Sequence, residues 1–425
     1  MIRFYNGSIL KFSPEAQIVS GEVWVEGSTI VCAGAPGEKP EGGFEREIDL
    51  EGGVVIPGFK NAHTHTAMTF MRSLADDEPL ETWYHNTVFP SEAKLTEDSL
   101  YWFTKLGIME YVRGGVTAAF EMYYLRDAYV KACTSAGFRT VLCGGMNNYD
   151  EDPTMVERDY LKYNNSGELI SYQLGVHGEY TTCIERLEYV ASLAEKYQAP
   201  CFAHISETYD EVQGCLLRYS RTPPKLLNDI GFFKYGGGGF HFVHVNDEDI
   251  EIFAENKLWA ASCPCSNLKL ASGIAPLEKL RKRGVNLALG TDGAASNNAL
   301  SMFREMYLAS ALQKAQTGDA TAMPAGSVLK MACVGGAEMM RLNDCTGIEA
   351  GKKADLAVIG TELPNMRPVN NMISEIVYAG SSSNVKLTMI NGKIVYENGE
   401  YFIGDSAEEI YARTAEYSEK FKCGV

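Results

Sequence analysis

The amino-acid sequence predicts an α/β protein: a (β/α)₈ barrel of the TIM type with a small β-sandwich domain built from both chain ends. Short apolar runs alternate with amphipathic stretches in the middle of the chain, strand-like segments with tight turns occupy both ends, and histidines stand where apolar runs end. Alternating strands and helices are typical of a parallel sheet, and barrel enzymes collect reactive side chains at the carboxyl ends of their strands. We expect a β part at residues 1–55, the barrel at 56–344 and a second β part at 345–425.

The two chain ends share a style of short, β-forming segments. Their strand candidates are Ser20–Glu26, Thr29–Val31, Ala354–Ile359, Lys386–Ile390 and Lys393–Tyr396. Gly27-Ser28 forms a turn between the first two, and Asn391-Gly392 is typical of a two-residue hairpin between the last two. Because neither part is long enough to stand alone, we expect them to pair into one small β domain.

Eight apolar runs between these ends are candidates for the barrel strands. They are Gly53–Pro57, Val116–Phe120, Thr140–Leu142, Leu174–Val176, Ala199–Ala203, Gly239–Val243, Trp259–Ala261 and Val285–Leu289. The glycine run Gly236–Gly239 lacks the Lys-Ser/Thr that completes a phosphate-binding P-loop, so we interpret it as a turn that feeds the following strand.

Composition limits the class of protein. Hydrophobic residues make up 45% of the chain and charged residues 22%, and no apolar run approaches the ~18–20 residues of a membrane helix. The net charge of −17 disfavours nucleic acid as a partner, because an acidic surface repels phosphates. The 11 cysteines form no C-x-x-C pair and the N-terminus lacks a signal-peptide layout, which predicts reduced thiols in a cytoplasmic protein. We expect a small-molecule substrate, no membrane partner and a homo-oligomer.

Only seven histidines occur, and five of them stand at or just after the end of a candidate barrel strand. His63 and His65 follow the first of these strands, and alternate residues of a strand point the same way, so both rings can reach one ion. On its own this H-x-H spacing fits two ordinary polar histidines equally well.

Two further strand ends carry candidate reactive groups. His204 ends one strand, and Glu207 lies three residues on, so one could bind a metal while the other moves protons. Asp292 follows the last strand in Gly290-Thr291-Asp292-Gly293, where a turn aspartate is also common. Taken together, His63, His65, His204 and Asp292 predict a site for one Zn²⁺ or Fe²⁺ with an open position for water.

These strand ends resemble the amidohydrolase superfamily over nearly the whole chain. Within it, the sequence is similar to the methylthioadenosine/S-adenosylhomocysteine deaminases, the chlorotriazine hydrolases and the guanine deaminases. The segments that carry the resemblance are Val55–His65, His204–Thr208, Ser266–Pro276, Leu289–Asn298 and Gly351–Leu356.

The resemblance implies roles for single residues. His63, His65, His204 and Asp292 would bind the metal, and the family's catalytic histidine aligns with His241. His244 falls where an accessory histidine often stands, and for it we favour a structural interpretation. Some relatives bridge two metals with a lysine at the end of the fourth strand. This sequence has Leu174-Gly175-Val176-His177 there, which favours one metal, and the position of His177 contacts the substrate ring in the deaminases.

The implied activity is metal-dependent hydrolytic deamination of a purine-like ring, such as an adenosine-type nucleoside or a related base. Asp292 and His241 would hold the attacking water and take its proton. Glu207 would then pass protons to the ring nitrogen and to the departing amine. The alternative is hydrolysis of another C–N or C–Cl bond on a triazine, guanine or pterin-type ring.

The sequence also departs from these relatives. Two arginines that grip the amino-acid end of larger nucleosides are missing, one near Gly144 and one within residues 152–156. Ser262 stands where many relatives have histidine. By contrast, Glu92 and Trp83 match residues that relatives use around the ribose. We therefore expect a preference for substrates without an amino-acid tail, unless a cation from elsewhere replaces the arginines; Arg139 and Arg158 are the candidates.

Overall fold

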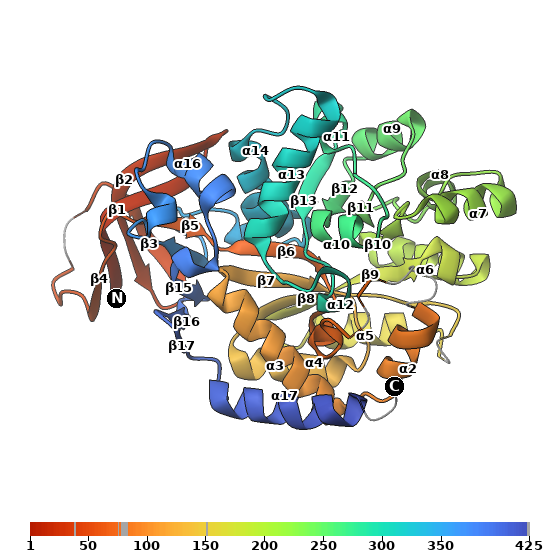
Figure 1. Ribbon diagram of the computed structural model, residues 1–425, viewed down its shortest axis with the longest axis horizontal. Helices are drawn as coiled ribbons and strands as arrows, with labels where there is room; N and C mark the ends of the chain where they lie inside the picture. Colours follow the sequence, from red (N-terminus) through yellow and green to blue (C-terminus); the bar gives the residue numbers. More distant parts are fainter. Residues whose placement is uncertain (38–39, 75, 78–83, 150–151, 423–425) are drawn as a thin grey trace.

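The computed structural model describes residues 1–37, 40–74, 76–77, 84–149 and 152–422. Its central part is a sheet of eight parallel strands surrounded by helices, and a second sheet lies at one end of it (Figure 1). The eight strands, in their order around the sheet, are β6 (Phe59–Thr64), β7 (Val116–Glu121), β8 (Arg139–Cys143), β9 (Ile170–Gly178), β10 (Cys201–Ile205), β11 (Gly237–His241), β12 (Trp259–Ser262) and β13 (Asn286–Leu289).

The last strand lies beside the first, which closes the barrel. Just beyond β13, the backbone N–H groups of Thr291 and Asp292 donate to the carbonyl of His63 in β6, at 3.1 and 3.0 Å. The (β/α)₈ barrel is therefore confirmed. Three phenylalanines, Phe120, Phe202 and Phe240, fill its interior, with the rings of Phe120 and Phe202 4.9 Å apart.

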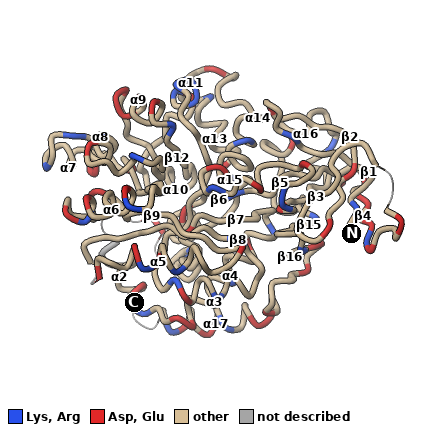
Figure 2. Tube along the Cα trace, turned by 180° about the vertical axis from the view of Figure 1, so that it is seen from behind, with Lys and Arg blue, Asp and Glu red and all other residues tan. Residues whose placement is uncertain are grey.

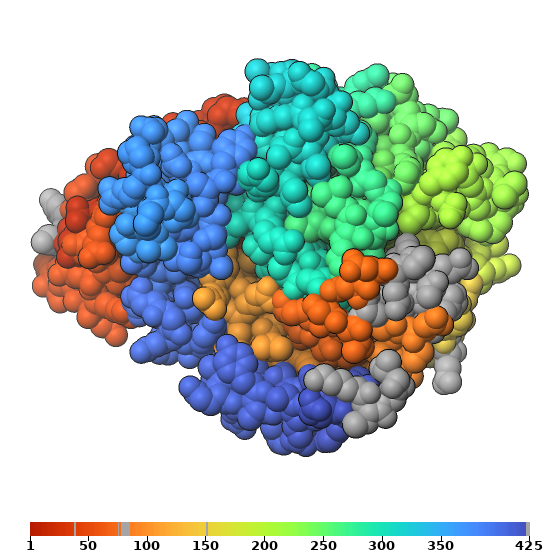
Figure 3. Space-filling model, in the orientation of Figure 1, coloured from red at the N-terminus to blue at the C-terminus, as the bar shows by residue number. Residues whose placement is uncertain are grey.

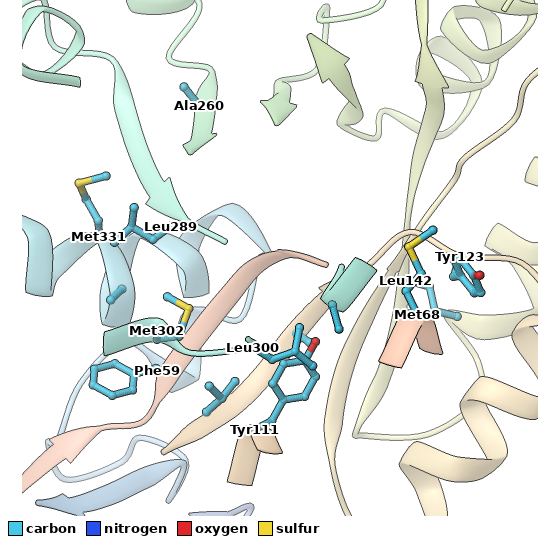
Figure 4. Close-up of a cluster of buried hydrophobic side chains, with 14 of the residues drawn as sticks. Phe59, Met68, Tyr111, Tyr123, Leu142, Ala260, Leu289, Leu300, Met302 and Met331 are labelled. Carbon is cyan, nitrogen blue, oxygen red and sulfur yellow. The ribbon is translucent and has the colours of Figure 1, made fainter. Parts of the chain in front are cut away.

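Helices cover the outside of the barrel. They are α3 (Glu97–Arg113), α4 (Arg126–Ala136), α5 (Met155–Tyr163), α6 (Ile184–Tyr197), α7 (Tyr209–Tyr219), α8 (Pro223–Asp229), α9 (Asp247–Glu255), α11 (Leu277–Lys282), α13 (Met302–Thr317) and α14 (Ala325–Lys330). Short helices follow several strands: η1 (Thr66–Met71), η2 (Tyr84–Val88) and α2 (Phe89–Glu92) come after β6, α10 (Pro264–Lys269) after β12 and α12 (Ala294–Asn297) after β13. The short segments η4 (Met331–Gly335) and α15 (Gly336–Met339) continue directly from α14. One continuous apolar cluster joins the helices to the strands, and Figure 4 shows part of it, including Phe59, Tyr111 and Met302.

One predicted barrel strand was wrong. Gly53–Pro57 contributes β5 (Val54–Pro57), which pairs with strands of the second sheet, and the barrel begins instead at β6. The error has a physical cause, because β6 has the sequence Phe-Lys-Asn-Ala-His-Thr, which does not form an apolar run, although every one of its residues is buried.

The glycine run also differs from the prediction. Gly237–Gly239 lie in β11 itself. Glycine is required in this strand because a Cβ on Gly238 would come within 2.0 Å of the carbonyl oxygen of Trp259.

The two chain ends join in one nine-stranded mixed sheet, as predicted. Its strands are β1 (Ile2–Phe12), β2 (Ala16–Glu26), β3 (Thr29–Gly34), β4 (Arg46–Asp49), β5, β14 (Leu356–Ile359), β15 (Val385–Ile390), β16 (Lys393–Glu397) and β17 (Glu400–Tyr401). Antiparallel pairing of β14 with β5 connects the two ends, and side chains from both, such as Phe4 and Leu387, share one core. Asn391 and Gly392 both have positive φ, 51° and 77°, as a two-residue hairpin turn requires.

Two contacts fasten the second sheet and the C-terminus to the barrel. The guanidinium of Arg139 at the start of β8 bonds both carboxylate oxygens of Asp355 at 2.6 and 3.0 Å, and both side chains are buried. The last helix, α17 (Ala407–Lys422), packs against α3 (Figure 3). The rings of Phe103 and Phe421 lie 5.8 Å apart in this contact.

Acidic and basic residues are interspersed over the outer elements (Figure 2). Within the described ranges, no helix has the length and apolar character needed to cross a membrane.

Candidate metal centre and active site

Four histidines gather at the carboxyl ends of the barrel strands. His63 and His65 come from β6 and the residue after it, His204 from β10 and His241 from the end of β11. The ring of His63 lies 4.9 Å from that of His65, 4.8 Å from that of His204 and 5.4 Å from that of His241. Beneath them, the ring of Phe240 stacks on His63 at 3.9 Å. The interior aromatic layer thus forms the floor of the site.

Asp292, three residues beyond β13, completes the cluster. Candidate ligand atoms fall in two overlapping groups, His63–His204–His241 and His63–His65–Asp292, and within each group they lie within 4.8 Å of one another. The structure therefore brings the four predicted ligands together and adds His241 to them.

Left-handed backbone turns aim several of these side chains inward. Ser206, His241, Phe242 and Asp292 have φ values of 52°, 72°, 54° and 59°. Such conformations cost free energy in residues other than glycine and persist only where surrounding contacts hold them. They occur here just beyond β10, at the end of β11 and beyond β13, where the strands give way to the site.

The hydrogen bonds of two histidines determine which ring nitrogen faces the centre. Nδ1 of His65 bonds the carbonyl of Met122, and Nδ1 of His204 bonds the carbonyl of His177 at 2.6 Å. A carbonyl can only accept, so Nδ1 carries the hydrogen in both rings and Nε2 presents a bare lone pair. Burial also lowers the pKa of His65 and lowers that of His204 well below its usual range, which keeps both rings neutral.

Hydrogen bonds also orient the carboxylate of Asp292 so that one of its oxygens faces the centre of the cluster. Its Oδ2 accepts hydrogen bonds from the hydroxyls of Ser266 and Ser296, at 2.6 and 2.8 Å, while Oδ1 lies 3.3 Å from Nε2 of His65. Burial disfavours its charge, but nearby histidines and the two hydroxyls outweigh burial and lower the pKa of Asp292. Bare imidazole nitrogens and a carboxylate oxygen converge without a hydrogen between them. This donor set fits a divalent cation of the zinc or iron type.

Glu207 and His241 face each other at the edge of the cluster. Oε2 of Glu207 lies 3.8 Å from Nε2 of His241, and its Oε1 is 3.5 Å from the hydroxyl of Ser272. Burial raises the pKa of Glu207, so this carboxyl can hold a proton. Nδ1 of His241 bonds Oδ1 of Asn267 at 2.8 Å. Burial opposes protonation of His241, but the charges of Glu207 and Asp292 prevail and raise its pKa.

His177 lies beside the cluster, whereas His244 points to a neighbouring loop. The ring of His177 is 4.6 Å from that of His204, and its Nδ1 bonds the hydroxyl of Thr181 at 2.9 Å. Burial lowers the pKa of His177 to about 4. Nε2 of His244 donates to the carbonyl of Ser272 at 2.7 Å, a contact that supports the loop facing Glu207.

Glu92 is connected to the site by a hydrogen bond from Tyr123, whose ring lies near His65. Its Oε1 accepts a hydrogen bond from the hydroxyl of Tyr123 at 2.7 Å, and the Tyr123 ring lies 6.2 Å from that of His65. Burial raises the pKa of Glu92 to about 7. Trp83 lies outside the described residues. Ser262 is buried at the end of β12, where its carbonyl accepts from the N–H of Gly290.

Arg139 and Arg158, the candidates to replace the absent arginines, both form ion pairs with aspartates. Arg139 is bound to Asp355 at the start of β8, the end of the strand remote from the site, and Arg158 lies on α5 with its guanidinium on Asp152 at 3.2 Å. Gly144 is closely packed, because a Cβ there would lie 2.6 Å from the carbonyl oxygen of Gly175. Arg139 is therefore not placed to bind a carboxylate at the site, whereas Arg158 is engaged in an exposed ion pair.

Three buried glutamates around the site were missed by sequence reasoning. Each accepts hydrogen bonds from a segment that follows a site strand: Glu121 from Thr66, Glu211 from Ser206 and Glu207, and Glu305 from Cys265 and Asn297. All three are nearly inaccessible to solvent. In the sequence, each of these glutamates stands beside an apolar residue in a strand or helix. An acidic residue at such a position indicates a buried carboxylate that must have hydrogen-bond partners.

Comparison with known proteins agrees with this geometry. The amidohydrolase family profile matches residues 54–395. The chain is 36% identical over 417 residues to a 5-methylthioadenosine/S-adenosylhomocysteine deaminase of Thermoanaerobacter pseudethanolicus, with 96% of both chains covered. A protein of the same name from Syntrophobacter fumaroxidans is 39% identical over 404 residues, with 92% of both chains covered.

Solved structures show the same fold. An adenosine deaminase from Xanthomonas campestris with bound zinc superposes with a TM-score of 0.94 at 29% identity, over 99% of this chain and 98% of that one. An atrazine chlorohydrolase from Arthrobacter aurescens, complexed with zinc, gives a TM-score of 0.91 at 21% identity, over 98% and 100% of the two chains. The resemblance noted in the sequence is confirmed, and the chain belongs to the amidohydrolase family.

Proposed function

We propose that this protein is a metal-dependent hydrolytic deaminase that removes the amino group from a purine-type nucleoside or a related base. The observation that carries the proposal is the pair formed by Glu207 and His241, 3.8 Å apart at the edge of the histidine–aspartate cluster. The names of the relatives, methylthioadenosine/S-adenosylhomocysteine deaminase and adenosine deaminase, support the same reaction.

His63, His65, His204 and Asp292 would hold one divalent ion, and zinc is the ion we propose, because two structures of the same fold contain it. When bound, such an ion lowers the pKa of a coordinated water toward neutrality and so supplies a nucleophile. Relatives with two metal ions bridge them through a lysine at the end of the fourth strand. The end of β9 has His177 and no lysine, which supports a single ion.

The protein's own groups divide the proton transfers between them. Asp292 and His241 would orient the attacking water and accept its proton, since His241 Nε2 faces the cluster while Nδ1 is occupied by Asn267. Glu207 would protonate the ring nitrogen beside the reacting carbon. The proton taken from the water by His241, whose Nε2 lies 3.8 Å from Oε2 of Glu207, would then return to Glu207, which would pass it to the departing amine. A single carboxyl can serve both atoms when each lies within hydrogen-bond reach.

His177 and Glu92 would contact the substrate. Nδ1 of His177 bonds the Thr181 hydroxyl, which itself donates to the carbonyl of Gly178. Nδ1 therefore carries the hydrogen, and Nε2 would accept a hydrogen bond from an N–H or O–H group of the substrate. Glu92, held by Tyr123, would accept hydrogen bonds from sugar hydroxyls if the substrate is a nucleoside, and we propose Trp83 as a second residue that contacts the sugar.

The alternative is a hydrolase that expels chloride or another amine from a related heterocycle, as the atrazine chlorohydrolase fold relative illustrates. Chloride leaves as an anion and needs little proton donation, whereas ammonia leaves poorly unless protonated. Burial of Glu207 raises its pKa and favours a carboxyl that donates a proton, which supports deamination.

The test is ammonia release from a panel of aminated purines, nucleosides, guanine, pterins and triazines, with chloride release measured on a chlorotriazine. The metal-stripped protein and Glu207→Gln serve as controls. Release of ammonia from an adenosine-type nucleoside, lost in both controls, is the expected result. Chloride release without ammonia release from any purine would contradict the proposal.

A further inference from the structure

Glu211 grips the backbone that carries Glu207. It lies in the first turn of α7, and its two carboxylate oxygens accept hydrogen bonds from the backbone N–H groups of Ser206 and Glu207, at 2.7 and 2.8 Å. Only 6% of the residue is exposed. Its own N–H donates to the hydroxyl of Thr208 at 3.1 Å, so the helix start and the site segment are joined from both directions.

The gripped segment has an unfavourable backbone conformation. Ser206 has a φ of 52°, and its carbonyl accepts from the N–H groups of Val243 and His244, at 3.1 and 2.8 Å. The Ser206 residue is therefore held through its N–H by Glu211 and through its carbonyl by the segment that follows His241. Since left-handed residues relax when their contacts are removed, this double hold keeps Glu207 and His241 in one geometry.

An analogous arrangement occurs on the opposite side of the site. The carboxylate of Glu305 accepts from the backbone N–H of Cys265 at 2.9 Å and from the side-chain amide of Asn297 at 2.7 Å. These residues adjoin Ser266 and Ser296, which hold Asp292. Buried carboxylates that organise site segments are thus a repeated feature of this barrel.

We propose that Glu211 is a positioning residue that holds the Glu207 carboxyl within proton-transfer reach of the substrate. The inference rests on the proposed function, in which Glu207 moves protons. Its carboxylate accepts hydrogen bonds from backbone N–H groups of the site segment and from none of the metal ligands, so we assign its effect on the reaction to the position of Glu207. Its replacement should lower kcat while leaving KM and the metal content close to their wild-type values.

The experiment is a double-mutant cycle of Glu211→Gln with Glu207→Gln, and Asp210→Asn is the matched control because Asp210 is an exposed acid in the same helical turn. The glutamine amide keeps one acceptor and faces the second backbone N–H with a donor. We expect kcat to fall at least ~10-fold, as for other groups that orient a reactive residue. In the Glu207→Gln background, Glu211→Gln should change the residual rate less than ~2-fold, because groups that act as a unit are not additive.

Hydrogen–deuterium exchange provides a readout that does not depend on activity. In the metal-free protein, the peptide that spans residues 203–210 should exchange faster in Glu211→Gln, whereas Asp210→Asn should match wild type. If Glu211→Gln does not fold, Glu211→Asp takes its place in the cycle, since the shorter side chain cannot reach both N–H groups.

Three results would overturn the inference: an unchanged kcat, equal losses in both Glu207 backgrounds, or loss of bound metal. A wild-type protein that releases no ammonia from any substrate would instead overturn the proposed function. In that case the exchange measurement still decides whether Glu211 holds the segment, so the two failures are distinguishable.

Discussion

Oδ1 of Asp292 lies 3.3 Å from Nε2 of His65, and neither atom brings a hydrogen to the contact. The His65 ring donates from Nδ1 to a backbone carbonyl, and the carboxylate is ionised because its pKa is lowered. Two lone pairs that face each other at this distance repel, and a cation bound by both atoms removes the repulsion.

We therefore expect about one Zn²⁺ or Fe²⁺ per chain. Elemental analysis of protein purified without chelator measures it, and a chelator should abolish activity and lower Tm until the metal is returned. Asp292→Ala should lose the metal, whereas Asp210→Asn should keep it. Two ions per chain, or full activity in metal-free protein, would contradict the assignment.

Glu207→Gln should retain the metal, because Glu207 is not among the grouped ligand atoms. Its kcat should fall by at least ~10²-fold, since the amide cannot carry protons between the ring nitrogen and the amine. Glu195→Gln, an exposed glutamate paired with Lys234, is the control and should behave as wild type. Near wild-type turnover in Glu207→Gln would mean that another group moves the protons.

Substrate preference follows from the absent arginines. Each charge-assisted hydrogen bond to a carboxylate is worth ~1.5–3 kcal/mol, so losing two should cost an acid-bearing substrate ~10²-fold or more in kcat/KM. Arg139 is held by the buried Asp355 and does not replace them, and Arg158 pairs with Asp152. Methylthioadenosine and adenosine should therefore be preferred to S-adenosylhomocysteine. The measurement is kcat/KM for all three, and a clear preference for S-adenosylhomocysteine would show the prediction to be wrong.

Restoring an arginine at the glycine position should not restore binding of a carboxylate. A Cβ at residue 144 would meet backbone atoms of Gly175 at 2.6 and 2.7 Å, so even Gly144→Ala should destabilise the protein by ~1–3 kcal/mol through overpacking. Gly42→Ala, where a Cβ meets nothing within 4 Å, is the matched control. Thermal unfolding compares them, and equal Tm values would contradict the packing seen here.

The buried carboxyl of Glu305 should make stability depend on pH. Burial raises its pKa from 4.5 to about 7 in the folded protein. The folded state therefore keeps this proton longer than the unfolded chain, and the resulting stabilisation is complete below pH ~4.5 and is lost as the pH rises through 7. The difference in unfolding free energy between wild type and Glu305→Gln should thus fall over this range, by at most ~1.36 kcal/mol per pH unit. Urea unfolding at several pH values measures it, and a flat difference would be the contrary outcome.

The sequence by itself determined the barrel and four of the residues at its centre. Strand periodicity places His63 and His65 on one side of the chain, and strand-end positions bring His204 and Asp292 to the same face, because parallel strands share a carboxyl edge. The pairing of the two chain ends was predictable for a similar reason, since short β segments are unstable alone.

Only the tertiary structure decided which strand is the first of the barrel, which buried carboxylates bond the site segments and which partners the arginines bind. β5 and β6 are both buried, and only pairing with β1 and β14 shows that β5 belongs to the other sheet. Arg139 and Asp355 lie 216 positions apart, and Glu305 reaches the segment of Cys265 across 40 positions. Local spacing specifies the direction of a side chain, but a partner that distant in sequence is chosen by packing, where every buried charge must find the group that compensates its lost hydration.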